Sequence, residues 1–233
     1  MNKAGYNERL FSGGVRKWLH EARFHWLTNQ CIEFGLVQKT VLELGCFDAR
    51  SISYLPMLPS QYYGFDANWE GGLDRAKHIW RDNNKYVFKM ATKPGDLDIN
   101  KKVDLCLCLE TIEHIPPELV NGYLKRLLEA LKTDGVLLVT VPNEKGIIFL
   151  AKYLAKKFFL GGSEQYDFLE VVNAVLGRMS RVRRREHKGF DWEQLREQLC
   201  EFFVITQIQG VQFSWLPVWA NPQIGFVMKP KRV

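Results

Sequence analysis

The sequence predicts an α/β protein with a doubly wound, mostly parallel sheet of seven strands and a helical cap inserted after the fifth strand. Short apolar segments alternate with helical patterns along most of the chain, an order that places successive parallel strands in one sheet. Residues 103–109 are almost wholly apolar, as expected for a central strand covered on both faces. Glu43, Asp66 and Glu110 come at or near strand ends, where such sheets bind ligands.

A first helix is expected from Gly14 to about Phe34, where apolar residues recur at helical spacing and Gly35 can end it. It either covers the sheet or forms a lid whose N-terminal side touches a ligand. Further helices are expected at 49–55, 70–81, 117–131 and 191–203. The strands are expected at 41–44, 61–66, 86–90, 103–109, 135–141, 203–210 and 224–228. No helix separates the last two strands, so they should pair antiparallel.

Residues 144–190 interrupt this alternation and are expected to form the cap. A basic amphipathic helix is expected at 146–160, followed by a second helix that runs to about Met179. An insertion at this point of the chain should lie over the ligand-binding edge of the sheet. We therefore expect one domain, 1–233, with an N-terminal helical segment at 1–36 and a cap at 144–190.

Composition limits the classes of protein to consider. The chain has 233 residues, of which 46% are hydrophobic and 25% charged, so it can bury a core and is not of the disordered type. It contains no apolar run of about 20 residues and no apolar signal-peptide core. Five cysteines without metal-ligand spacing fit a reducing cytoplasm, and Cys106 and Cys108 are expected in the core. The net charge of +6 favours anionic partners.

Two strand ends carry a pattern typical of nucleotide sites. The segment 41–50 (VLELGCFDAR) reads as a strand, a turn with Gly45 and the start of a helix, which brings backbone amides and a helix N-terminus to a ligand. Asp66 ends the next strand, 23 residues after Glu43, at the spacing expected of an acid that binds ribose hydroxyls. We expect these two carboxylates to converge on one adenosyl group.

These segments resemble the class I S-adenosylmethionine (SAM)-dependent methyltransferases. The resemblance covers residues 38 to 145 and includes 43–46 (ELGC), 64–66 (GFD), 103–115 (VDLCLCLETIEHI) and 135–143 (GVLLVTVPN). It departs from the family in the first turn, where Phe47 and Ala49 replace glycines. The resemblance implies a Rossmann-like methyltransferase fold and SAM as cofactor. It implies cofactor contacts from Glu43, Gly45, Cys46, Phe47, Asp66, Ala67, Asn68, Thr92, Leu109 and Glu110, with Asp96 and Leu97 as alternatives to Thr92 for the adenine.

Glu110, Glu113 and His114 form the sharpest cluster of reactive residues. On one helical turn, positions i, i+3 and i+4 share a face, and His187 could complete the set from the cap. We expect His114 or His187, with Glu113, to act as a general base without metal. A purely structural role is the second alternative, and a Mg²⁺ or Mn²⁺ site made by Glu110, Glu113, His114 and His187 is the least favoured of the three. The metal alternative resembles the small-RNA 3′-terminal 2′-O-methyltransferases.

The function expected is O-methylation of a sugar, as in polysaccharide biosynthesis, or of another small-molecule hydroxyl. One alternative is metal-dependent 2′-O-methylation of RNA 3′ ends, and another is a non-catalytic SAM-binding subunit, for which the missing glycines argue. The arginine cluster at 178–185 is either solvated or binds a phosphate-bearing acceptor or RNA, with nucleic acid the less favoured partner. Residues 146–160 could touch an anionic membrane, so the expected location is the cytoplasm or the inner membrane face. The sequence sets no oligomeric state.

Overall fold

A seven-stranded sheet forms the centre of the computed structural model, which describes residues 14–159, 166–185 and 187–231. The strand order is β3-β2-β1-β4-β5-β7-β6. The strands are β1 (Thr40–Leu44), β2 (Gln61–Asp66), β3 (Tyr86–Met90), β4 (Val103–Leu109), β5 (Leu131–Pro142), β6 (Phe203–Gly210) and β7 (Gln223–Pro230). All neighbours are parallel except β7, which runs antiparallel to both β5 and β6. The expected fold class and the antiparallel final pair are confirmed.

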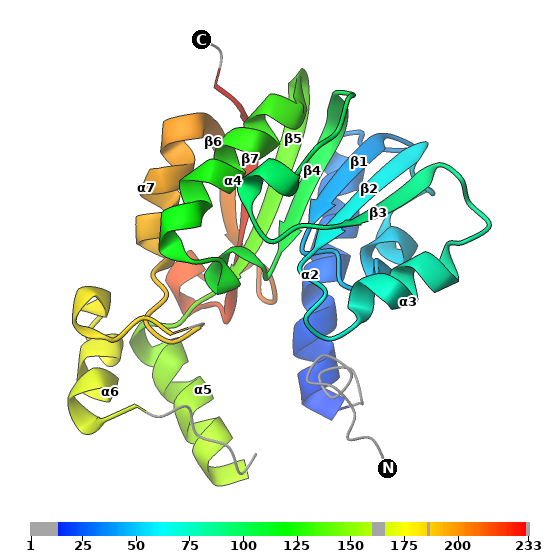
Figure 1. The fold of residues 1–233 in the computed structure, drawn as a ribbon. Helices are drawn as coiled ribbons and strands as arrows, with labels where there is room; N and C mark the ends of the chain where they lie inside the picture. Colours follow the sequence, from blue (N-terminus) through cyan, green and yellow to red (C-terminus); the bar gives the residue numbers. More distant parts are fainter. Residues whose placement is uncertain (1–13, 160–165, 186, 232–233) are drawn as a thin grey trace.

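Helices cover both faces of this sheet (Figure 1). One face packs against α4 (Pro117–Ala130) and α7 (Trp192–Phe202), and its core includes Leu124, Leu127, Leu195 and Leu199. The other face packs against α2 (Gly14–Glu33), the 3₁₀ turn η1 (Arg50–Tyr54) and α3 (Gly72–Ile79). Strand β4 is buried on both faces, and Cys106 and Cys108 lie in the core as expected. The predicted residues 1–13 of the N-terminal segment lie outside the described residues.

The boundary between α4 and β5 corrects the sequence expectation. The strand was expected to begin at Gly135 after a helix ending at residue 131, but α4 ends at Ala130 and β5 begins at Leu131. Leu131 is buried and pairs with Val103, and Lys132 forms an ion pair with Asp104 at 2.8 Å. These contacts draw the chain into the sheet before Asp134 and Gly135, a pair typical of turns.

The cap follows β5 and contains α5 (Gly146–Phe159) and α6 (Phe168–Val175), with a 3₁₀ turn at Met179–Arg181. Both helices lie beyond the ends of β4 and β5 (Figure 1), as expected for an insertion over this edge. The second cap helix is shorter than expected, because the chain turns at Gly177, which has a φ of +72°. Residues 160–165 and 186 lie outside the described part of the cap. Within the described residues, no helix is both long enough and apolar enough to span a bilayer.

Candidate active site at the ends of the central strands

The loops after β1, β2 and β4 are held in an unusual backbone conformation. Five non-glycine residues of the described chain have positive φ, and four of them lie in these loops: Phe47, Ala49, Asn68 and Glu110. A side chain in this region of φ and ψ costs roughly 1–2 kcal/mol. Such strain persists where the surroundings enforce it and tends to cluster at functional sites. The backbone therefore marks the edge that the sequence singled out.

The loop after β1 is fixed to its neighbours through Gly45. The amides of Gly45 and Cys46 donate to the carbonyl oxygen of Phe65 at 2.7 and 3.1 Å, which holds the loop against β2. Gly45 has a φ of +77°, and a Cβ built on it would lie 2.1 Å from Oγ1 of Thr111 in the loop after β4. Only glycine combines this φ with so close an approach. The Cys46 side chain is buried, so its expected cofactor contact stays a prediction.

Phe47 and Ala49 replace the family's glycines but keep the glycine-like backbone, with φ of +47° and +56°. The ring of Phe47 lies against the start of α3, where a Cβ on Gly72 would come within 2.3 Å of it. The guanidinium of Arg75 lies 4.9 Å from the centre of the same ring. A glycine on the neighbouring element thus accommodates the extra bulk, and the turn keeps the shape that the glycines would give it.

Asp66 and Asn68 organise the loop after β2. The two Asp66 carboxylate oxygens accept from the amides of Phe47, at 2.9 Å, and Asn68, at 2.7 Å. The Asn68 side chain accepts from the Leu73 amide at 3.1 Å and so supports the first turn of α3. Each carboxylate oxygen can accept a second bond, and Asp66 is half-exposed. Asp66 therefore retains acceptor capacity for ribose hydroxyls, while that contact and those of Ala67 and Asn68 stay predictions.

Glu43 lies deeper than expected. It is 3% exposed, and one oxygen accepts hydrogen bonds from the hydroxyls of Ser51 and Tyr62. Burial raises the pKa of its carboxyl to about 7, against the lowering effect of these two hydroxyls. The expectation that Glu43 and Asp66 converge on one ligand is corrected in this respect, because Glu43 bonds inside the protein and only Asp66 of the two is half-exposed. Glu43 instead ties η1 and β2 beneath the Gly45 loop.

The loop after β3 is closed on itself. The Asp96 carboxylate accepts from the amides of Thr92 and Lys93, at 2.9 and 3.1 Å, and from the Thr92 hydroxyl. The Thr92 amide is the first of the groups that lower the pKa of Asp96. Thr92 is exposed and Leu97 is buried. The predicted adenine contact from Thr92 or Asp96 is not tested by this geometry.

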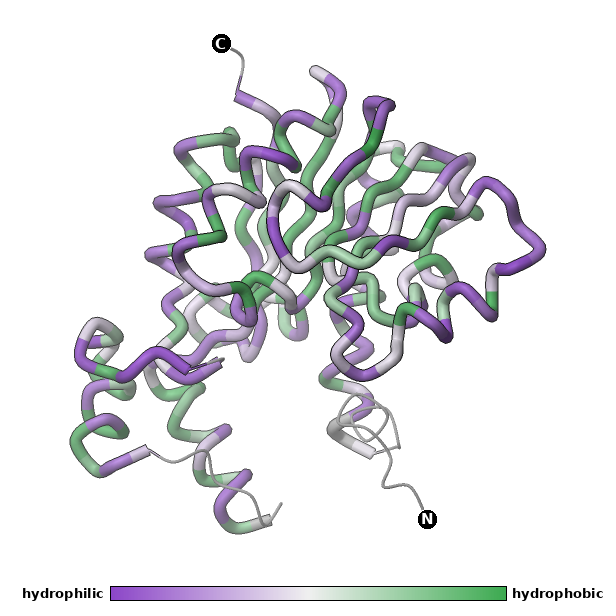
Figure 2. Tube along the Cα trace, in the orientation of Figure 1, coloured by the Kyte–Doolittle hydropathy of each residue, from purple (hydrophilic) through white to green (hydrophobic). Residues whose placement is uncertain are grey.

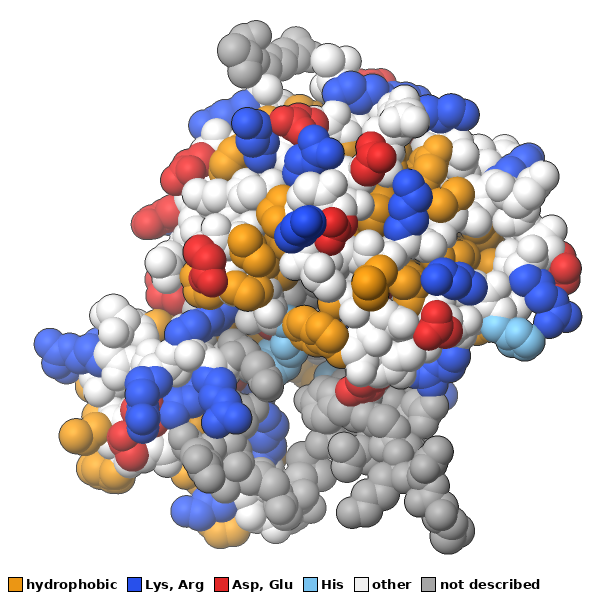
Figure 3. Space-filling view, viewed as in Figure 1, with side chains coloured by type: hydrophobic (Ala, Val, Ile, Leu, Met, Phe, Trp, Pro, Cys, Tyr) orange, Lys and Arg blue, Asp and Glu red, His pale blue; other side chains and the backbone are white. Residues whose placement is uncertain are grey.

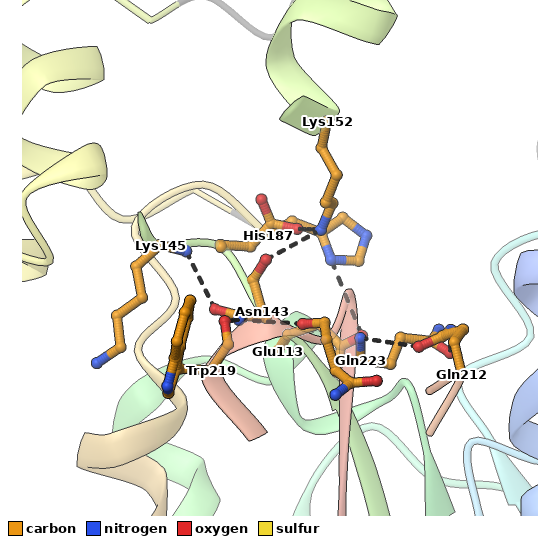
Figure 4. A network of polar contacts seen from close by, with 10 residues as sticks. Glu113, Asn143, Lys145, Lys152, His187, Gln212, Trp219 and Gln223 are labelled. Carbon is orange, nitrogen blue, oxygen red and sulfur yellow. Dashed lines mark hydrogen bonds and ion pairs between the residues drawn. The ribbon is translucent and has the colours of Figure 1, made fainter. Parts of the chain in front are cut away.

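The structure brings Glu113, His114 and His187 together at the end of β4. The 3₁₀ turn at Ile112–His114 carries the first two, and the cap supplies the third. Nδ1 of His187 lies 3.8 Å from Oε1 of Glu113 (Figure 4), and the two imidazole rings meet edge to face with centres 4.3 Å apart. The expected meeting of the cap histidine with the strand-end pair is present in the structure. Leu109, the last residue of β4, is buried, so its expected cofactor contact stays a prediction.

Burial dominates the electrostatics of this cluster. Glu113 is 1% exposed, and neither of its oxygens has a hydrogen-bond partner among the described residues. Burial, followed by repulsion from Glu110, raises the pKa of Glu113 well above its ordinary value. Burial also lowers the pKa of His187 to about 2, so its imidazole is neutral near pH 7. A buried carboxyl without a partner is costly and is a feature of sites that await a ligand.

The same cluster is the group of described residues best placed to hold a metal. One ligand atom from each of Glu113, His114 and His187 lies within 4.8 Å of the others. Imidazole nitrogen with carboxylate oxygen suits several divalent transition metals. The Glu113 oxygens, which have no hydrogen-bond partner among the described residues, also fit the binding of a metal ion. Glu110, the fourth residue of the predicted set, does not belong to this group.

Polar contacts fasten the cap over the site. Lys152 of α5 pairs with Glu144 and donates to the carbonyl of Asn143 at 3.2 Å (Figure 4). Arg184 donates to the carbonyl of Glu113 at 2.9 Å. Next to His187, Lys188 forms a buried ion pair with Glu170 of α6 at 2.6 Å. These bonds fix the segment that carries His187.

The predicted arginine cluster therefore divides into two groups. Arg183 bonds to Glu170 within the cap, and Arg184 bonds to the backbone carbonyl of Glu113 after β4. All five arginines, Arg178, Arg181 and Arg185 among them, are exposed. Whether these three bind an acceptor stays a prediction.

Arg23, which α2 brings to this site, was not predicted from the sequence. Burial lowers the pKa of its guanidinium, while Glu110 and then Glu113 act in the opposite direction. The available signal was a basic residue between Ala22 and Trp26 on the apolar side of the helix. Arg23 gives the N-terminal helix a charged contact with the site, in line with the lid alternative.

Comparison with known proteins gives a consistent family. A family described as "Methyltransferase domain" matches residues 15–211 of the chain. A ubiquinone biosynthesis O-methyltransferase of Haemophilus ducreyi is 25% identical over 192 residues, which cover 77% of this chain and 79% of that protein. Another from Rickettsia bellii is 26% identical over 147 residues, but the match spans only 60% of its length and 57% of this chain.

Solved structures show the same fold. A SAM-dependent methyltransferase from Clostridium acetobutylicum superposes with a TM-score of 0.62 at 16% identity. The superposition covers 97% of this chain and 99% of that one. At this identity the likeness is one of fold, and it extends over the whole architecture described above.

Proposed function

The chain belongs to the class I SAM-dependent methyltransferases, and on that premise we propose that it methylates a hydroxyl oxygen of a small-molecule acceptor. The observation that carries this proposal is the cluster of buried Glu113 with half-buried His114 and His187 at the end of β4. It supplies a proton acceptor beside the edge of the sheet at which the fold binds its cofactor.

Several groups described above would hold the cofactor. Because Gly45 has no side chain, its loop would allow the cofactor to come close to the backbone. Half-exposed Asp66 can accept hydrogen bonds from the ribose hydroxyls. Arg23 offers a cation for the carboxylate of the methionine moiety. When bound, SAM supplies a methyl group already activated by its positive sulfonium sulfur. The protein therefore has to orient the acceptor, exclude water and remove one proton.

His187, in the cap, is the residue proposed to remove that proton. A hydroxyl that forms a bond to carbon must lose its hydrogen, and the neutral imidazole of His187 can accept it. Oε1 of Glu113, 3.8 Å from His187 Nδ1, is placed to stabilise the positive charge that this transfer puts on the imidazole. The cap that carries His187 also shields this step from water. No metal is required in this reading.

The relatives support oxygen as the methylated atom. Both are named as ubiquinone biosynthesis O-methyltransferases, whereas neither name supports the saccharide acceptor expected from the sequence. We therefore place a phenolic hydroxyl ahead of a sugar hydroxyl as the acceptor. A phenolic hydroxyl is more acidic than a sugar hydroxyl, so it loses its proton to a weaker base.

The test is methyl transfer from radiolabelled SAM to a panel of catechols, nucleotide sugars and short RNAs. We expect label on a phenolic oxygen, and for His187→Gln a kcat lower by roughly 10²–10⁴-fold with a nearly unchanged KM for SAM. Lys125→Gln, on the exposed side of α4, is the control and should match the wild type. Label on nitrogen or carbon, or full activity of His187→Gln, would rule the proposal out.

A second candidate function is metal-dependent 2′-O-methylation of RNA ends, because the site has the geometry to hold a metal ion. Its specific support is the grouping of Glu113, His114 and His187 within 4.8 Å. The same assay decides between the two. Label transferred to RNA, abolished by a chelator and restored by Mn²⁺, would favour this candidate, while chelator-resistant transfer to a phenol would exclude it.

A further inference from the structure

The apolar face of α6 points away from the protein. Phe168 and Leu169 are 80% and 70% exposed, and Val172 and Leu176 are exposed as well. These residues fall at positions i, i+1, i+4 and i+8, within an arc of about 100° on a helix. The opposite side of α6 carries Glu170, whose buried ion pair with Lys188 faces the interior. Helix α6 is therefore apolar on both sides, because Ala174, Val171 and Val175 pack in the cap core while the other apolar side chains face outward, unlike a typical surface helix with one polar face.

Helix α5 presents a second apolar stripe. Ile147, Leu154 and Phe158 are exposed, at positions i, i+7 and i+11, and therefore lie on one line along the helix. The two helices are joined by aromatic contacts, with the rings of Phe149 and Tyr166 centred 4.9 Å apart. In Figure 2 apolar segments continue through both helices at the outer end of the cap. The stripes of α5 and α6 together are called here the cap face.

Positive charge is concentrated around the cap face. Residues 144–190 contain ten Lys and Arg against five Asp and Glu, a formal charge of +5 out of +6 for the whole chain. Exposed members of this group are Lys157, Arg178, Arg181 and Arg185. Figure 3 shows basic side chains beside hydrophobic ones over α5 and α6. Exposed apolar side chains ringed by basic residues are the pattern of helices that lie in a membrane interface.

We propose that the cap face docks this protein on an anionic lipid bilayer. Phe168, Leu169 and Phe158 would enter the headgroup region, and the exposed basic residues would contact lipid phosphates. Charge decides in favour of lipid over a second copy of the chain, because two cap faces would bring like charges of +5 together. The apolar side chains decide against RNA, which the cap would contact through its basic residues alone. The contact is peripheral and extends beyond the expected 146–160 segment to α6.

The test is sedimentation of the purified full-length protein with vesicles of phosphatidylcholine containing about one-third phosphatidylglycerol, at physiological ionic strength. The wild type should bind these vesicles and bind pure phosphatidylcholine at least tenfold more weakly. Phe168→Ser/Leu169→Ser should bind at least tenfold more weakly, because both side chains are exposed and their loss spares the core. Ile79→Ser, an exposed apolar residue on α3, is the matched control and should bind like the wild type.

Charge is tested separately. The triple variant Lys157→Gln/Arg178→Gln/Arg181→Gln should lose about 100-fold in partitioning, since each basic group near such a surface contributes about fivefold. A control with the same net charge, Lys77→Gln/Lys85→Gln/Lys125→Gln, should lose little, because these lysines are exposed away from the cap.

Three outcomes would overturn the proposal: no vesicle binding by the wild type, equal losses in cap and control variants, or a dimer by light scattering that Phe168→Ser/Leu169→Ser converts to monomer. The assay contains neither methyl donor nor acceptor. Its result is therefore independent of the proposed reaction.

Discussion

Replacing Gly45 by alanine adds one atom, a Cβ, and tests how tightly the loop after β1 packs against Thr111. The new Cβ would lie 2.1 Å from Oγ1 and 2.4 Å from Cγ2 of Thr111, and the backbone would keep a φ of +77°. The left-handed conformation costs roughly 1–2 kcal/mol for a residue with a side chain. Forcing the Thr111 contact apart adds roughly 1–3 kcal/mol. Gly45→Ala should therefore lower the free energy of unfolding by about 2–5 kcal/mol, less a few tenths regained from the stiffer unfolded chain.

A matched glycine separates the two costs. Gly35 has a φ of +63° and no atom within 4 Å of the position that a Cβ would take. Gly35→Ala therefore carries the backbone cost alone, roughly 1–2 kcal/mol. The difference between the two variants, about 1–3 kcal/mol, measures the close approach of the loops after β1 and β4.

The assay is urea unfolding of Gly45→Ala, Gly35→Ala, Thr111→Ala and the Gly45→Ala/Thr111→Ala double variant. Thr111→Ala removes the two nearest atoms, so the double variant should recover about 1 kcal/mol or more relative to additivity. Equal losses for Gly45→Ala and Gly35→Ala, or strict additivity with Thr111→Ala, would refute the reasoning. Gly45→Ala should also weaken cofactor binding, whereas Gly35→Ala should leave it unchanged.

Two further predictions concern buried charges. The Glu43 carboxyl has a pKa of about 7 in the folded protein against 4.5 ordinarily, so between these values the folded state holds a proton that the unfolded state has lost. Stability should therefore fall by about 3 kcal/mol as pH rises from 4.5 to 7, and urea unfolding of Glu43→Gln across this range should lack that loss; parallel pH profiles for the two proteins would contradict the assignment. Lys188, next to His187 in the chain, forms an ion pair with Glu170, and Lys188→Met removes this pair. It should lower thermal stability by roughly 1–3 kcal/mol and reduce kcat for methyl transfer at unchanged affinity for S-adenosylhomocysteine, whereas weaker binding of that ligand would show that the ion pair acts elsewhere.

Much of the sheet could be predicted because its strands have a strong local signal. Residues 103–109 form an uninterrupted apolar segment, and the observed β4 has the same bounds. Strand β3 also has the predicted bounds, 86–90. The start of β5 could not be predicted, because the pairing of Leu131 with Val103 is a long-range contact that overrides the local Asp-Gly turn signal.

The sequence identified which residues form the site better than it identified where they lie. The spacing of Glu110, Glu113 and His114 indicated a cluster, and the meeting with His187 depends on a cap whose position no local pattern specifies. The depth of Glu43 follows from hydroxyls on two other elements, Ser51 and Tyr62, and was not expected.

Loss of the glycines at 47 and 49 suggested a non-catalytic protein when the sequence was considered alone. The structure shows that the backbone retains positive φ at both positions and that Gly72 makes room for the Phe47 ring. The compensating residue lies 25 positions along the chain, so a local motif could not reveal it.

We propose that the loops after β1 and β2 form one cofactor site in which Asp66 takes part. Isothermal titration of S-adenosylhomocysteine into the wild type and Asp66→Ala tests it most directly. We expect saturable binding at one site per chain, weakened at least tenfold in Asp66→Ala because a charge-assisted hydrogen bond to the ribose is lost. No heat of binding with the wild type, or an unchanged Kd in Asp66→Ala, would contradict it.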